Sequence, residues 1–149
     1  MFPHLPKFSA LGALALALPL LAASGGCNRY SRTKQCRALI AQVNPALDEV
    51  TALTHGGAGG SNGGFIAAAG RYERLAKQLG PMEFASEDMA KLVAEYASLL
   101  TASALNLRTL ATAVDSNNTI ESDRINRELE RISTHERTVV ARMDAWCQP

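Results

Sequence analysis

The sequence predicts an all-α protein with the architecture of an up-down-up-down four-helix bundle. Four stretches of the 149-residue chain carry apolar residues at spacings of three and four, and no stretch alternates as a half-buried strand does. Turn signals separate each stretch from the next, at 55–64, 80–81 and 115–118. Four helices joined in sequence by short connections most simply pack antiparallel to their neighbours.

The first helix is expected to follow an apolar stripe made of Cys36, Leu39, Ile40, Val43, Leu47, Val50 and Leu53. Pro45 lies inside this stripe, and two interpretations stay open. Either one helix kinks at Pro45, or Asn44 caps and Pro45 opens a separate helix. Residues 55–64 contain six glycines and predict a loose connector rather than a tight hairpin turn.

The second helix is predicted over 65–79, where Phe65, Ala69, Tyr72, Leu75, Ala76 and Leu79 form its apolar stripe. Gly80 and Pro81 end it, with Gly80 expected in the left-handed conformation common at helix ends. Ser86 then predicts the N-cap of the third helix, with Glu87 and Asp88 in its first turn.

The third helix has the most regular pattern, a bundle seam formed by Met89, Val93, Tyr96, Leu100, Ser103, Leu107, Leu110 and Val114. After the turn at 115–118, Asn118 and Glu121 form a start signal like a capping box. The fourth helix presents one apolar side, made of Ile125, Leu129, Ile132, Val139, Val140, Met143 and Trp146. Its charged face is expected to hold i,i+4 pairs between Asp123 and Arg127 and between Arg124 and Glu128.

Residues 1–26 read as an export signal that is removed. Lys7 precedes an uncharged apolar run over 10–23, and a stretch of small residues follows. The run is interrupted by Pro19 and is shorter than the ~20 apolar residues that cross a membrane. A cleaved signal is therefore predicted instead of a membrane-spanning anchor.

Cys27 directly follows Ser24-Gly25-Gly26, and this segment resembles the lipobox of bacterial lipoproteins over the first 27 residues. Gly25 and Gly26 match the small residues of that motif, whereas Ser24 stands where Leu is usual. The resemblance implies cleavage before Cys27, diacylglycerol on its thiol and an acyl chain such as palmitate on its new amino terminus. Asn28 in place of the Asp linked to inner-membrane retention implies the outer membrane.

A second cleavage pattern is also present. Ala22-x-Ser24 suits general signal peptidase, which would release a soluble protein that begins at Gly25.

The chain holds three cysteines, and exported thiols tend to pair. Lipidation of Cys27 leaves Cys36 and Cys147 for a disulfide. These two residues fall at the start of the first helix and the end of the last, which meet at one end of the predicted bundle, so the bundle is expected to be closed by this bond. The alternative pairs Cys27 with Cys36 and leaves Cys147 buried and free.

The segment 27–35 is interpreted as a membrane-proximal tether, and 36–149 as the bundle. Basic side chains precede the first acidic residue, Asp48, at four positions: Arg29, Arg32, Lys34 and Arg37. Each basic residue at an anionic bilayer surface contributes ~1 kcal/mol to binding. The alternative is a solvated polar linker.

No motif announces catalysis, a metal or a cofactor other than the covalent lipid. His135-Glu136 begins a zinc-protease motif, but Val139 occupies the place of the second histidine, and no Ser, His and acid signature is present. A formal net charge of +1 does not indicate the basic surface that binds nucleic acid. The sequence therefore favours a protein that is not an enzyme.

Polar residues interrupt two of the apolar stripes at about the same level. Ser103 interrupts the third helix and His135 or Glu136 the fourth, so these three residues are candidates for a polar layer in the core. The alternative is a boundary histidine and a solvated glutamate. Aromatic side chains at helical spacing are interpreted as core rather than as a pocket lining: Phe65, Tyr72, Tyr96 and Trp146.

The function expected from these features is a non-enzymatic lipoprotein of the bacterial cell envelope, attached to membrane lipid through Cys27. Its bundle would act as a structural module or bind an unknown protein partner. The alternative is a soluble periplasmic or secreted helical bundle that binds a small ligand.

Overall fold

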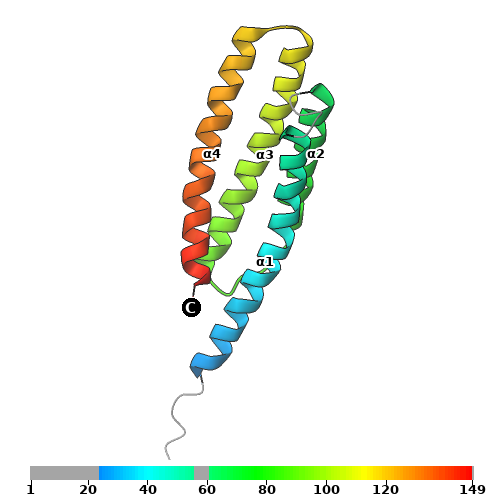
Figure 1. Ribbon diagram of the computed structural model, residues 1–149. Coiled ribbons are helices and arrows are strands. Elements are labelled where there is room, and N and C mark those ends of the chain that lie inside the picture. The colour runs from blue at the N-terminus through cyan, green and yellow to red at the C-terminus, as the bar shows by residue number, and fades with distance from the viewer. Residues whose placement is uncertain (1–23, 56–60, 149) are drawn as a thin grey trace, which may run out of the picture.

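The fold is an all-α four-helix bundle, seen in a computed structural model that describes residues 24–55 and 61–148. Its helices are α1 (Ser24–His55), α2 (Asn62–Leu79), α3 (Glu87–Asp115) and α4 (Thr119–Cys147). Consecutive helices run antiparallel, and the start of α1 and the end of α4 lie at the same end (Figure 1). The predicted fold class is confirmed, whereas most of the expected signal peptide, 1–23, lies outside the described residues.

Helix α1 is continuous through Pro45, so the interpretation as one helix is correct. Pro45 lies on the exposed face, where the carbonyl that loses its intrahelical donor is open to water. Residues 27–35, expected as a tether, form the first turns of α1, which project beyond the end of α4 (Figure 1). Ile40, which was predicted for the apolar stripe, is exposed, whereas Ala46, which was not, is buried. The reason is that α1 packs mainly on α2 and buries only a narrow stripe.

Helix α2 begins three residues earlier than predicted because Ser61 caps it. The Ser61 Oγ accepts from the Gly64 N–H at 3.2 Å, so Asn62–Gly64 belong to the helix rather than to the connector. The left-handed conformation expected of Gly80 is wrong: its φ of −54° and ψ of −44° are right-handed. Pro81, which has no N–H to extend the ladder, ends the helix instead.

The turn between α3 and α4 is built from two adjacent asparagines. Asn117 adopts a positive φ of 51°, and the Asn118 N–H donates to the Ala113 carbonyl at 2.8 Å, as in a Schellman ending. The Asn118 side chain then accepts from the Glu121 N–H at 3.1 Å and opens α4, as predicted. Ser86 caps α3 in the same way, through the Met89 N–H.

The charged face of α4 and the end of the α3 stripe differ from the prediction. Arg124 pairs with Glu121 at 2.6 Å, and Glu128 with Arg131 at 2.6 Å, each over three residues instead of four. Val114 is exposed, because α3 ends there and Ala113 turns toward α4.

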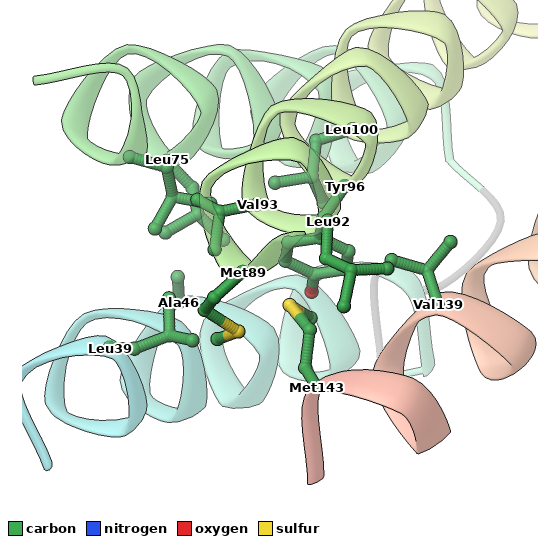
Figure 2. Close-up of a cluster of buried hydrophobic side chains, with 11 residues drawn as sticks. Leu39, Ala46, Leu75, Met89, Leu92, Val93, Tyr96, Leu100, Val139 and Met143 are labelled. Atoms are coloured by element: carbon green, nitrogen blue, oxygen red, sulfur yellow. The ribbon is translucent and has the colours of Figure 1, made fainter. Parts of the chain in front are cut away.

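The core divides into three clusters along the bundle. The cluster near the end of α4 contains large side chains from all four helices and is drawn in Figure 2: Leu39, Ala46, Leu75, Leu79, Met89, Leu92, Val93, Tyr96, Leu100, Val139 and Met143. The middle cluster is built largely from Ala68, Ala69 and Ala104. Small side chains therefore line the middle of the bundle, where space is left next to α1 and α4.

None of the helices in the described part of the chain has both the length and the apolar character needed to span a bilayer.

Candidate functional site

One end of the bundle is closed by a disulfide between Cys36 of α1 and Cys147 of α4, as predicted. The two Cα atoms lie 5.8 Å apart, and 111 positions separate the cysteines in sequence. Beyond this bond, α1 and α4 contact each other less than any other pair of neighbouring helices. The disulfide is therefore the main link between the first and last helices.

Arg32 adds two contacts at the same end. Its guanidinium donates to the Gln148 carbonyl at 2.7 Å and lies 5.8 Å from the centre of the Trp146 ring. This basic residue thus holds the end of α4 against the first turns of α1, a role that the sequence did not indicate.

The other basic residues predicted near the membrane all lie on α1. Lys34 and Arg37 are exposed, and their charges are open to solvent or to another surface. Arg29 and Cys27 lie in the first turns of the helix, and their side chains are outside the described residues. The structure therefore places this basic segment on a helix that projects from the closed end.

A cavity of about 210 Å³ opens where α1 and α4 diverge in the middle of the bundle. All four helices line it, through Val50, Thr54, Tyr72, Ser103, Leu107, Leu129, Ser133 and Glu136. Ser103 and Glu136, two of the three residues predicted for a polar layer, thus face the same space.

The third predicted residue, His135, lies outside this layer. Its Nε2 is 2.7 Å from an Oε1 atom of Glu95 on the exposed side of α3 and α4. Successive residues on a helix point about 100° apart, so only one of His135 and Glu136 can face the cavity. The structure selects Glu136.

Burial dominates the electrostatics of the cavity. It raises the pKa of Glu136, and the neighbouring Tyr96 hydroxyl offsets only part of this effect. Burial, with the Glu136 charge as the second cause, raises the pKa of Tyr72 to about 12 and that of Tyr96 well above its ordinary value. Both phenols therefore stay protonated at neutral pH, and the carboxyl of Glu136 is the group that can titrate.

The Tyr96 hydroxyl is buried without an acceptor in hydrogen-bond geometry among the described residues. Both Tyr72 and Tyr96 are expected in the core from their helical spacing. Tyr96 does lie in the core (Figure 2), whereas Tyr72 reaches the cavity wall. The sequence does hold a signal for these two tyrosines. Each places a phenol on an apolar helix stripe, and both phenols lie near Glu136.

The sequence matches no protein-family model, no curated protein and no solved structure.

The raised pKa of Glu136 predicts how the free energy of unfolding depends on pH. The folded state binds the Glu136 proton more tightly than the unfolded state, whose pKa is the ordinary 4.5. The stability from this group is fully present below that value and is lost as the pH rises through the folded-state pKa. The uncharged variant Glu136→Gln should therefore be more stable than the wild type at neutral pH and equally stable near pH 4.

Urea unfolding at a series of pH values measures this difference between variant and wild type. Glu130→Gln, at an exposed position of the same helix, is the control and should show no such pH-dependent gain. A constant difference between Glu136→Gln and the wild type across this range would contradict the prediction.

Proposed function

We propose that this protein is a lipoprotein of the bacterial cell envelope, in which acylated Cys27 attaches a disulfide-closed helical bundle to a membrane, the outer membrane being favoured. The bundle serves as a non-catalytic structural or protein-interaction module. The observation that carries the proposal is the pairing of Cys36 with Cys147.

This pairing settles which cysteine is left over. The chain has three cysteines, and two of them join α1 to α4. Cys27 then has no cysteine of its own chain to pair with. An unpaired cysteine in an exported protein is often modified in another way. The lipobox-like residues before Cys27 favour lipidation as that modification.

The charges at the start of α1 also favour a membrane surface nearby. The first turn of α1 holds no acidic residue, and basic residues at 29, 32 and 34 follow within the next turns. Positive charge near a helix N-terminus opposes the helix dipole and destabilises the end of the helix. Anionic lipid headgroups would offset this repulsion and add ~1 kcal/mol of attraction for each basic residue.

The proposal predicts that Cys27→Ala moves the protein from the membrane to the soluble fraction, because the only site of lipid attachment is removed. The measurement is fractionation of cells that make the full chain, followed by detection of the protein in each fraction. Ala38→Ser, a change of similar size at an exposed position of α1, is the matched control and should stay with the membrane. Retention of the Cys27→Ala protein in the membrane fraction would argue against the anchor.

A further inference from the structure

A groove runs along the solvent side of α2 and α3, the two helices that pack together most extensively (Figure 1). It consists of two adjoining hollows of about 320 and about 500 Å³, which share Glu73, Ser98 and Thr101 in their linings. Along α3 the lining reaches from Ala97 to Arg108, which is about three helical turns. The groove therefore has the length of a short helical segment.

The wall that α3 contributes to this groove is uncharged and partly apolar. No charged residue occurs at 96–107, although Ser98, Thr101 and Leu105 in that stretch are exposed. In α4, by contrast, charged side chains recur in every turn over 124–137. Leu105 is 66% exposed and lines the larger hollow. A single exposed leucine is ordinary, but a leucine in an uncharged groove between two helices is typical of surfaces on which amphipathic helices dock.

The charges beside the groove are mainly basic. Glu73 is the one acid in the lining, and Arg108 neutralises it through two hydrogen bonds of 3.0 and 2.9 Å. The Arg108 hydrogen bond is the main cause that lowers the pKa of Glu73, and the nearby charges of Lys77 and Arg74 lower it further. Lys77 and Arg74 are exposed, and neither forms an ion pair in 24–55 or 61–148. These two residues give the edge of the groove a surplus of positive charge.

The shape and the charge of the groove select its occupant. In a symmetric dimer, Lys77 and Arg74 of one copy would face the same basic residues of the other, so like charges would meet. A bilayer surface is flat and does not fill a groove. A helix with an apolar face fits the space between two helices, and acidic side chains beside that face would pair with Lys77 and Arg74.

We therefore propose that the groove between α2 and α3 binds the apolar face of an acidic amphipathic helix of a partner protein. The proposal rests on the interaction role proposed above for the bundle, and it does not depend on lipid attachment to Cys27.

The test uses a synthetic peptide and the isotopically labelled, disulfide-bonded Cys27→Ala protein, which carries no lipid. The peptide has about 18 residues, long enough to form a helix, with leucines spaced by three and four and glutamates beside the leucine face. Nuclear magnetic resonance titration is expected to give saturable shifts at amides of the groove on α2 and α3. The same peptide with lysine in place of each glutamate should bind at least about tenfold more weakly. Shifts that do not saturate, or equal binding of the two peptides, would overturn the proposal and leave the membrane anchor, which fractionation tests, unaffected.

Three variants locate the binding site. Arg74→Glu with Lys77→Glu should weaken binding of the glutamate peptide at least about tenfold. Arg127→Glu with Arg142→Glu makes the same change of charge at exposed positions of α4 and should bind the peptide as the unaltered groove does. Leu105→Ala should also weaken binding, because it removes the apolar side chain that the groove exposes most. Equal weakening by the two double variants would show attraction by net charge alone and would overturn the proposal.

Two other measurements test whether a different occupant covers the groove. A dimer in sedimentation that Leu105→Ala converts to a monomer would assign the groove to a second copy of the chain. Binding to vesicles of phosphatidylcholine and phosphatidylglycerol that Leu105→Ala abolishes would assign this face to a membrane. Either result would overturn the proposal, which predicts neither. The two peptides are compared on an unaltered groove, so the proposal stays testable if a variant fails to fold.

Discussion

Removal of the disulfide between Cys36 and Cys147 is expected to lower the free energy of unfolding by about 4 to 5 kcal/mol. The bond closes a loop across a sequence separation of 111, so it removes much of the freedom of the unfolded chain. A loss of this size is close to the entire stability of a small domain. The double variant Cys36→Ala with Cys147→Ala removes both thiols of this bond together, and urea unfolding measures the change.

The structure also predicts where the damage appears. Helix α1 is held to α4 mainly by the disulfide and the Arg32 contacts. In contrast, α2 packs extensively on α3, and α3 packs extensively on α4. Hydrogen exchange in the double variant should therefore increase more in α1 than in α3. Cys27→Ala is the matched control and should leave the unfolding midpoint unchanged. A double variant with the midpoint of the wild type would show that the bond does not stabilise the fold.

Leu100→Ala is expected to destabilise the protein by about 2 to 5 kcal/mol. Leu100 is 1% exposed and packs in the large cluster near the end of α4, between α3 and its neighbours (Figure 2). Truncation there removes buried methyl groups and leaves a void. Both the lost burial and the void lower the free energy of unfolding. Thermal or urea unfolding of the disulfide-bonded variant measures it.

Leu105→Ala on the same helix is the control. Leu105 is 66% exposed, so its truncation should change the free energy of unfolding by less than about 0.5 kcal/mol. The two variants share the residue type and the helix, and they differ only in burial. Similar costs for both would mean that Leu100 is not in the core.

Much of the fold could be predicted from the sequence because its signals are local. Asn118 caps α4 and Ser86 caps α3 with hydrogen bonds to residues three positions away, which a sequence pattern can reveal. The Gly80 prediction failed because two signals for a helix end overlap. Pro81 alone stops the helix, so Gly80 is free to stay right-handed.

The cavity could be predicted only in part, because it depends on which residues of four helices reach the same level. The interruptions of the apolar stripes indicated Ser103 and Glu136, which line the same cavity, together with His135, which does not line it. Tyr72 of α2 joins them in the lining because the cavity opens where α1 and α4 diverge. That divergence is a property of packing between helices, and no single stretch of sequence encodes it.

The measurement that tests the proposed attachment most directly is the intact mass of the protein isolated from membranes. The expected result is a chain that begins at Cys27, carries the mass of diacylglycerol and an N-acyl group, and is lighter by two hydrogen atoms because of the Cys36–Cys147 bond. A chain that begins at Gly25 without added lipid would contradict the proposal that two cysteines close the bundle and the third attaches it.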